Sequence, residues 1–348
     1  MTDHASWLAY VGCRTTRERN AQGRGLMVFR CATDKAWTRL QLVEGLRNPS
    51  FLCLHPTQPM LYAVHGDFEE ITRLRIGKDG LLTQLQQLST WGRNPVHLAF
   101  TPSGGWLLVA NYATGTVVSL RAAEDGTLGE VAHLLALPGE RGPHAQQDGS
   151  HPHQICFSPD GAFAFVPDKG VDCVFAVQVN EDTGCLAIAG TAHFPAGTGP
   201  RHMVFHPSLP LAYLVGELER SVTTLRRDGP NLTAIASVSS LPLFVDEGSA
   251  AGIVLSADLR TLYVSNRGHD SVVAFPVDSS GGLGAPTWVA AGRTPRFITE
   301  SPDRDGLVIA REDGHSIALL SANSHSYQAT DVVETGSPVC IVFRRPNQ

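Results

Sequence analysis

The sequence predicts an all-β fold in which seven similar units form a β-propeller, and three observations carry this prediction. A short module recurs along the whole chain of 348 residues. Successive modules begin 43 to 57 residues apart, close to the period that is typical of propeller blades. The apolar runs within each module are short and rich in β-branched residues, and no long amphipathic helical pattern interrupts them.

Each module consists of a turn dipeptide, a first apolar run, a polar turn and a second apolar run. In the second module Asn94-Pro95 precedes His97–Phe100, and Trp106–Ala110 follows the turn. In turns such as Ser158–Gly161, proline presets φ and glycine takes the position of positive φ. A third strand then follows, as in Val117–Leu120. The module starts are Pro49, Pro95, Pro152, Pro200, Ala250, Pro295 and Pro338.

The seventh module is incomplete, because little of the chain remains after Phe343. At the other end of the chain, Trp7–Val11 and Leu26–Phe29 have the character of a second and a third strand. We therefore expect the C-terminal strand to join the N-terminal strands in one sheet, which would protect the edges that an open array exposes. The prediction is a seven-bladed β-propeller, its last blade closed by both termini, in a single domain over residues 1–348.

Composition excludes several classes of function. A net charge of −6, a pI near 6.1 and the lack of any Lys/Arg run argue against a nucleic-acid partner. Seven cysteines without metal-binding spacing indicate mostly buried, small apolar residues in a reducing compartment. Met1–Ser6 lacks the features of a secretory signal, and no apolar stretch approaches the ~18–20 residues that cross a bilayer. We expect a cytoplasmic protein with no membrane partner; the sequence leaves its oligomeric state open.

Antiparallel geometry brings two sets of residues to one face. The loop that enters the innermost strand and the loop that leaves the second strand lie on the same side of a blade. Residues one position after each module start should therefore surround one mouth of the channel: Ser50, Val96, His153, Arg201, Ala251, Arg296 and Val339. The same applies to positions 16 and 17 after each start: His65, Asn111, Asp168, Gly216, Asn266 and Arg311, then Gly66, Tyr112, Lys169, Glu217, Arg267 and Glu312.

The third, fourth and fifth modules thus bring four candidate catalytic residues to one rim. These are His153, Arg201, Glu217 and Arg267. A base, a carboxylate and two guanidinium groups suit proton transfer on an anionic substrate. The competing interpretation is a structural salt-bridge network, but convergent polar groups at a channel mouth favour a binding site. Candidate substrate-binding residues near them are Asn111, Tyr112, Asp168, Asn266, Arg296 and His202.

Several polar residues have structural alternatives. Asp168 could equally brace its blade by accepting backbone hydrogen bonds, and structural roles are also favoured for His151 and His202. His55 and His206 precede turn prolines and should cap turns, while His97 should lie in the core. An insertion at Pro138–Ser150 accounts for the longest gap, and it could form a lid or wall over the same face.

The sequence indicates neither a cofactor nor a metal. It contains no Gly-rich phosphate loop, no nucleophile elbow and no dinucleotide fingerprint. The arginines at the predicted mouth argue against a bound cation. We expect the site to work without either.

Five strings resemble the lactonase family of seven-bladed propellers, which includes bacterial 6-phosphogluconolactonases and the fungal carboxymuconate lactonizing enzyme. They are Ser150–His153, Phe165–Asp168, Gly199–His202, Gly216–Leu218 and Tyr263–Ser271. The resemblance covers essentially the whole chain and implies a metal-independent site on the channel face. The histidine, two arginines and glutamate proposed for the fungal member correspond to His153, Arg201, Arg267 and Glu217. Ala250–Gly252 and Lys169 depart from the family pattern.

The resemblance implies a partner that is a small anionic lactone, and hydrolysis of a sugar-acid lactone, foremost 6-phosphogluconolactone. His153 or Glu217 would activate the water, while Arg201 and Arg267 would hold the anion or stabilise the oxyanion. Two alternatives stay open at this point. One is a cycloisomerase that forms a lactone from a muconate-type diacid, and the other is a non-catalytic propeller that binds a ligand or protein partner.

Overall fold

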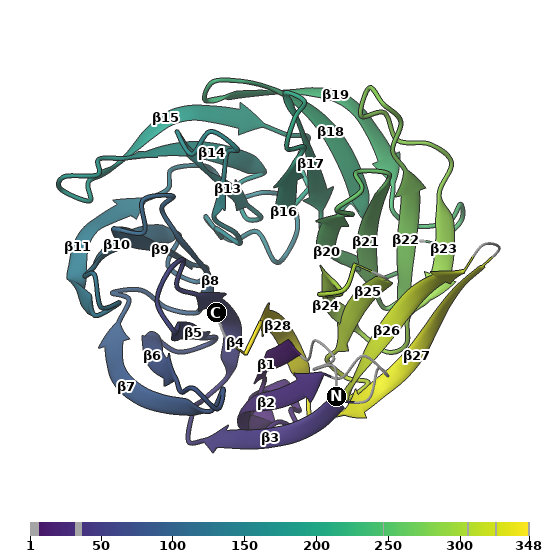
Figure 1. The fold of residues 1–348 in the computed structure, drawn as a ribbon. Coiled ribbons are helices and arrows are strands. Elements are labelled where there is room, and N and C mark those ends of the chain that lie inside the picture. Colours follow the sequence, from purple (N-terminus) through teal and green to yellow (C-terminus); the bar gives the residue numbers. More distant parts are fainter. Residues whose placement is uncertain (1–6, 32–36, 246, 305, 324–325, 347–348) are drawn as a thin grey trace.

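Seven four-stranded antiparallel sheets form a closed ring around a central channel (Figure 1). The computed structural model describes residues 7–31, 37–245, 247–304, 306–323 and 326–346. Within these ranges the only helix is the three-residue 3-10 turn η1 (Arg17–Arg19), and no helix is long and apolar enough to span a membrane. The all-β, seven-bladed prediction is confirmed.

The blades are numbered from the first complete sheet along the chain, and each runs from the channel outward. Blade 1 contains β4 (Pro49–Leu54), β5 (Met60–His65), β6 (Glu70–Ile76) and β7 (Leu82–Ser89). Blade 2 contains β8 (Pro95–Phe100), β9 (Trp106–Asn111), β10 (Thr116–Ala122) and β11 (Leu128–Ala136). Blade 3 contains β12 (Cys156–Phe157), β13 (Ala164–Asp168), β14 (Cys173–Val179) and β15 (Leu186–His193).

The next three blades repeat this order. Blade 4 contains β16 (Pro200–Phe205), β17 (Leu211–Gly216), β18 (Ser221–Asp228) and β19 (Asn231–Ser239). Blade 5 contains β20 (Ser249–Leu255), β21 (Thr261–Arg267), β22 (Ser271–Pro276) and β23 (Thr287–Ala290). Blade 6 contains β24 (Pro295–Glu300), β25 (Gly306–Arg311), β26 (Ser316–Asn323) and β27 (Ser326–Glu334).

Blade 7 is shared by the two ends of the chain. Its strand order is β28 (Pro338–Arg344), β1 (Trp7–Cys13), β2 (Gly25–Cys31) and β3 (Trp37–Glu44). β28 pairs antiparallel with β1, so that Pro338 lies opposite Cys13. The predicted closure of the ring by both termini is confirmed, and it leaves no unpaired innermost strand.

A β-bulge follows the start of the innermost strand in most blades. In blade 4, Pro200 pairs with Gly216 and His202 pairs with Val215, so that Arg201 is the extra residue. The pairing register shifts in the same way, by one extra residue, after Pro295, Pro49, Pro95, Ala250 and Pro338. A bulge re-aims the side chain of the extra residue. In five of these six blades the extra residue lines the central cavity: Ser50, Val96, Arg201, Arg296 and Val339.

Blade 3 departs most from the repeat. Its innermost strand is shorter than the predicted Gln154–Phe157, because β12 covers only Cys156–Phe157. Upstream of it, Pro152 forms an isolated bridge with Asp168, and the His153 amide donates to the carbonyl of Pro167. The long insertion that precedes this segment replaces regular pairing with a loop. His153 is nevertheless held at the position that the repeat assigns to it.

Apolar cores lie between neighbouring blades around the whole ring. Each of seven clusters in the described residues joins two adjacent blades. Second strands such as β5 and β9 are buried throughout, because both of their faces pack against a neighbour. This explains why they read as continuous apolar runs. Four cysteines, at positions 13, 31, 173 and 340, are buried free thiols, whereas Cys185 is exposed.

Buried tyrosines connect blades by hydrogen bonds. The hydroxyls of Tyr10, Tyr62 and Tyr213 donate to the carbonyls of Gly80, Gly126 and Gly281 in the outer hairpin of the next blade. All three tyrosine side chains are fully buried. These bonds fix the angle between neighbouring blades at three places in the ring.

Replacing Tyr62 by phenylalanine should destabilise the ring without disturbing the core. The substitution leaves the buried carbonyl of Gly126 without its donor, which should cost about 1–3 kcal/mol. Urea denaturation followed by tryptophan fluorescence measures the change. A midpoint equal to that of the wild type would show that this bond does not connect the blades energetically.

Candidate functional site

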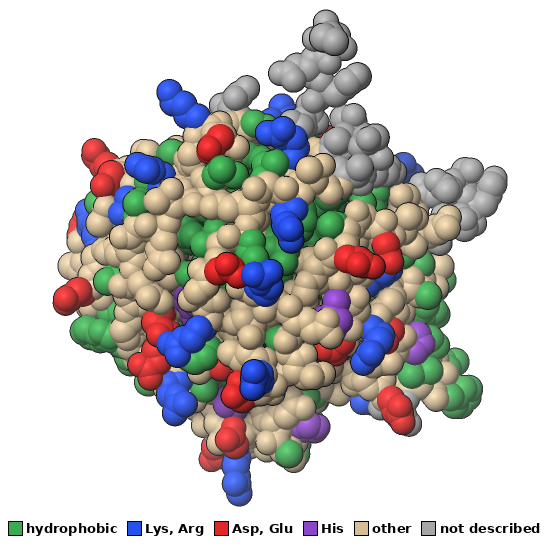
Figure 2. Space-filling model, turned by 90° about the horizontal axis from the view of Figure 1, so that it is seen from below, with side chains coloured by type: hydrophobic (Ala, Val, Ile, Leu, Met, Phe, Trp, Pro, Cys, Tyr) green, Lys and Arg blue, Asp and Glu red, His purple; other side chains and the backbone are tan. Residues whose placement is uncertain are grey.

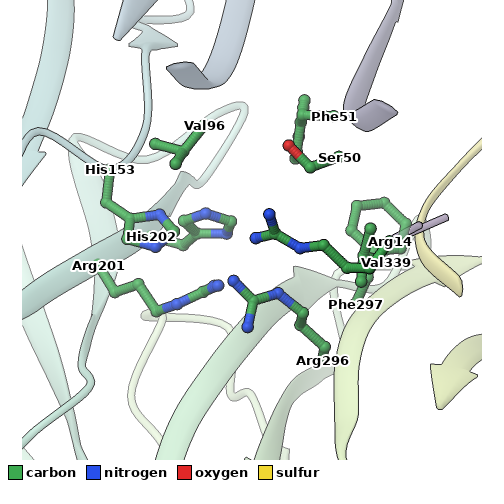
Figure 3. A pocket seen from close by; sticks show the side chains of 10 residues that line it. All are labelled: Arg14, Ser50, Phe51, Val96, His153, Arg201, His202, Arg296, Phe297 and Val339. Carbon is green, nitrogen blue, oxygen red and sulfur yellow. The ribbon is translucent and has the colours of Figure 1, made fainter. Parts of the chain in front are cut away.

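A cavity lies at the centre of the ring, where residues of six blades converge in the described part of the chain (Figure 3). Six of the seven side chains predicted one position after each module start line this cavity. Ala251 of blade 5 is the exception. The lining residues are Arg14, Ser50, Phe51, Val96, His153, Arg201, His202, Arg296, Phe297 and Val339.

Glu217 is the centre of the first charged cluster. Its Oε1 lies 2.7 Å from Lys169 Nζ and 3.1 Å from Arg267 Nη2, and its Oε2 lies 2.8 Å from Arg201 Nε. The side chain is 7 % exposed, so these pairs are largely shielded from water. Burial alone would raise the pKa of Glu217, but the three cations lower it well below its usual range. Glu217 is therefore an ionised carboxylate with both oxygens in ion pairs.

Backbone carbonyls of blade 5 complete the positioning of the two arginines. Arg201 Nη1 donates to the carbonyl of Ala251 at 2.8 Å, and Arg267 Nη2 donates to that of Ala250 at 3.2 Å. Burial lowers the pKa of Arg201 to about 9, so the group stays charged at neutral pH. Ala250 and Ala251 thus contact the two arginines through backbone oxygens.

Glu312 is the centre of a second cluster across the channel. Arg296 Nη1 donates to Glu312 Oε2 at 3.2 Å, and Arg14 Nε lies 3.8 Å from Oε1 of the same carboxylate. Arg14 also lies 3.4 Å from Asp67 through Nη1, and Arg19 pairs with the same aspartate. Burial would raise the pKa of Glu312, but Arg296 and Arg14 lower it.

Three histidines are packed together beside these clusters. The rings of His97 and His153 lie 5.9 Å and 5.2 Å from the ring of His202. Burial and then Arg201 lower the pKa of all three, that of His97 to about 3. All three are therefore neutral at physiological pH. Nδ1 of His153 and Nε2 of His202 have no hydrogen-bond partner among the described residues.

The two clusters hold more cations than carboxylates. Five cations, Lys169, Arg14, Arg201, Arg267 and Arg296, contact or adjoin Glu217 and Glu312. On the side of the molecule that Figure 2 shows, basic and acidic side chains are instead interspersed. The positive excess is thus a property of the cavity, and it favours an anionic ligand.

Three predicted substrate-binding residues are not among the lining residues of the cavity. The amide of Asn111 bonds to the backbone and hydroxyl of Thr90, and Asn266 makes the equivalent bonds with Ser240. Asp168 accepts from Ser150 and from the amides of His151, Gly170 and Val171. These side chains are fully buried and hold the connection from the preceding blade, because position 16 points into the blade.

The other three predicted substrate-binding residues lie at the site. His202 and Arg296 line the cavity. Tyr112 is half-buried beside the cavity. Its ring is stacked on that of His151, with the ring centres 4.3 Å apart, and lies edge-on to that of His153, with the ring centres 5.7 Å apart. Position 17 after a module start therefore faces the channel, in contrast to position 16.

The predicted insertion forms a fixed wall beside the site. Gln147 is fully buried and donates to the carbonyl of Lys169 and to Asp172. Its neighbour Gln146 accepts from Lys169 Nζ at 2.5 Å. His151 bonds to Asp148 and to the carbonyl of Tyr112, which confirms its structural role.

Three further histidines expected to be structural, His55, His206 and His97, have structural contacts. Nδ1 of His55 accepts from the amides of Thr57 and Gln58, and His206 caps its own turn in the same way. His97 is buried and packs on Phe51 at 4.1 Å. No group of three or more His, Cys, Asp or Glu side chains in the described ranges could hold a metal ion.

Arg14 lines the cavity but is absent from the residues that the sequence predicted for the site. Pro338 pairs with Cys13 as Pro200 pairs with Gly216, so Arg14 occupies position 17 of blade 7. Positions 16 and 17 of blade 7 do not follow Pro338 in the sequence, because this blade is split between the two ends of the chain. Continuing the count of positions onto the N-terminal strand would have found Arg14.

These features define a seven-bladed β-propeller with a histidine-lined, cation-rich cavity at the centre of its ring. Residues 8–343 match the family described as "Lactonase, 7-bladed beta-propeller". The chain belongs to this lactonase family.

Similar proteins agree with this assignment over nearly their full lengths. A protein named 6-phosphogluconolactonase from Bacillus subtilis (strain 168) is 30% identical, with 97% of this chain and 98% of the relative aligned. A protein of the same name from Formosa agariphila is also 30% identical, over 89% of this chain and 91% of the relative. The solved structure of a periplasmic gluconolactonase from Pseudomonas aeruginosa has a TM-score of 0.87 at 28% identity, covering 97% of this chain and 99% of that one.

The buried histidines should make the protein less stable as the pH falls. Their pKa values are lower in the folded than in the unfolded state, so the unfolded state binds more protons below about pH 6.5. Each histidine should contribute up to about 1.4 kcal/mol per pH unit between pH 6.5 and 5. Urea denaturation at several pH values measures the free energy of unfolding, which should fall less steeply with decreasing pH in His202→Gln than in the wild type. The exposed His144→Gln is the control, and equal slopes in all three proteins would contradict the prediction.

Removing the charge of Glu217 should destabilise the fold. In Glu217→Gln three buried cations lose their shared carboxylate, at a cost of about 3–5 kcal/mol. Adding Lys169→Met should restore part of this loss, because one uncompensated cation disappears. Thermal unfolding of the two single variants and the double variant measures the coupling. Strictly additive effects would show that the two side chains do not stabilise each other.

Proposed function

We propose that this chain is a lactonase that hydrolyses a sugar-acid lactone, with 6-phosphogluconolactone as the preferred substrate and 6-phosphogluconate as the product. The observation that carries this proposal is that His153, whose neutral imidazole can accept a proton, lines one cavity together with Arg201 and Arg296. The names of the relatives from Bacillus subtilis and Formosa agariphila support the choice of substrate.

His153 is the better candidate for the general base. Both oxygens of Glu217 are engaged by cations, and its lowered pKa makes it a weak base. His153 is neutral and lines the cavity. In this mechanism Glu217 holds Arg201, Arg267 and Lys169 in place.

Binding of an anionic substrate should make His153 a stronger base. Besides burial, the neighbouring cations Arg201, Lys169 and Arg296 depress its pKa. A substrate anion between the arginines would cancel part of that positive field and raise the pKa of His153 toward the range suited to proton transfer. The base would then act most effectively when the cavity is occupied.

The chemical step requires only water and these residues. A water oxygen forms a bond to the lactone carbonyl carbon while one of its protons passes to the imidazole of His153. Arg201 stabilises the oxyanion that develops on the carbonyl oxygen. When the ring C–O bond breaks, the ring oxygen takes the proton from His153, and the product is an open-chain hydroxy acid that ionises.

Substitution of either residue should slow the reaction. His153→Gln should lower kcat/KM for 6-phosphogluconolactone by about 10²–10⁴, because the positioned base is lost. Arg201→Met should lower it by about 10²–10³ through loss of oxyanion stabilisation. The measurement is the rate of lactone opening above the spontaneous rate, with thermal unfolding of each variant as a check on folding.

His55→Asn is the matched control, because asparagine keeps an acceptor for the turn that this histidine caps. Wild-type rates in both site variants would overturn the mechanism. An ultraviolet assay with a carboxymuconate tests the reverse chemistry on the same site. Turnover of the muconate without lactone hydrolysis would replace the proposed reaction with cycloisomerisation.

A further inference from the structure

Arg14 differs from the other buried cations of the cavity in how it is paired. Its side chain is 3 % exposed, yet its nearest carboxylate oxygens lie 3.4 Å and 3.8 Å away, on Asp67 and Glu312. The cations around Glu217 lie 2.7–3.1 Å from their carboxylate. Nη1 of Arg14 donates one long hydrogen bond to Asp67, and its Nε, like Nε of Arg201 and Arg267, lacks a hydrogen bond of good geometry among the described residues. Burying a guanidinium with unpaired donors costs free energy of folding, and a bound anion that accepts those hydrogen bonds would offset this cost.

The chain leaves space for this guanidinium at one position. A Cβ atom on Gly66 would lie 2.3 Å from Nη1 of Arg14 and 2.8 Å from Oγ of Ser50. Because Gly66 has no side chain, the guanidinium of Arg14 can occupy the space where a Cβ atom would lie. Gly66 is also at position 17 of its module, where most other blades carry a long side chain.

Arg14 and Arg296 lie on the opposite side of the ring from the proposed catalytic residues. Arg14 follows β1 of blade 7 and Arg296 belongs to blade 6, whereas His153 and Arg201 belong to blades 3 and 4. Figure 3 shows the side chains of Arg14 and Arg296 pointing into the same cavity as His153 and Arg201. Ser50 lines it as well, with a hydroxyl that can donate to an anion.

We propose that Arg14, Arg296 and Ser50 form the subsite for the phosphate group of the lactone, while the ester lies beside His153 and Arg201. This inference rests on the proposed function and orients the substrate across the channel. Arg14 is then a specificity-determining residue that distinguishes phosphorylated from unphosphorylated lactones. Guanidinium groups suit this role because they donate two parallel hydrogen bonds to a phosphate.

The test compares 6-phosphogluconolactone with glucono-1,5-lactone. Arg14→Met should lower kcat/KM for the phosphorylated substrate by about 10- to 100-fold, mainly through KM, since a hydrogen-bonded charge is lost. It should leave kcat/KM for glucono-1,5-lactone nearly unchanged. Gly66→Ala should give the same pattern, because its methyl group displaces the guanidinium, and Arg14→Lys should lie between. Arg24→Met, an exposed arginine of the same blade, is the control.

Equal loss on both substrates, or no loss on either, would overturn the phosphate subsite. If the wild type opens neither lactone, the proposed function fails but the subsite remains testable by calorimetry. The proposed subsite requires that 6-phosphogluconate bind more tightly to the wild type than to Arg14→Met. Gluconate should bind both proteins with equal affinity. Equal binding of 6-phosphogluconate to the two proteins would refute it.

Discussion

The repeated β-bulge at the start of the innermost strands is the constraint on which the site depends. A regular antiparallel strand would alternate its side chains between the two faces of the blade, and both faces are occupied by the apolar cores between blades. The extra residue escapes this alternation and points along the channel. Arg201 and Arg296 reach the cavity in this way, and blade 3 delivers His153 through a looser version of the same geometry.

The repeat places several buried cations close together, and a folded protein must pair such cations with carboxylates. Glu217 offsets three cations on one side and Glu312 offsets Arg296 on the other, while Arg14 stays loosely paired. Burial and then the same cations lower the pKa of the neighbouring histidines. In the proposed function, an anionic substrate would offset part of this positive charge and raise the pKa of His153.

The repeat made most of the architecture predictable. Spacing and turn chemistry were sufficient for seven blades, for closure by both termini and for six of the seven cavity-lining residues one position after each start. The differences came from orientation and from connectivity. Asn111, Asp168 and Asn266 stand one residue before the channel-facing position 17, and a shift of one residue in a strand reverses the face. Arg14 was missed because its blade is split, and the pairing of Glu217 with Lys169 depends on side-chain contacts across blades that spacing does not encode.

The most direct test of the central claim is a crystal structure of the protein with 6-phosphogluconate bound. The account predicts the product across the channel mouth, with its carboxylate in hydrogen-bond contact with Arg201 beside His153 and its phosphate between Arg14 and Arg296. Product bound outside this cavity would contradict the assignment of the site. The reverse orientation within the cavity would contradict the division between a catalytic side and a phosphate side.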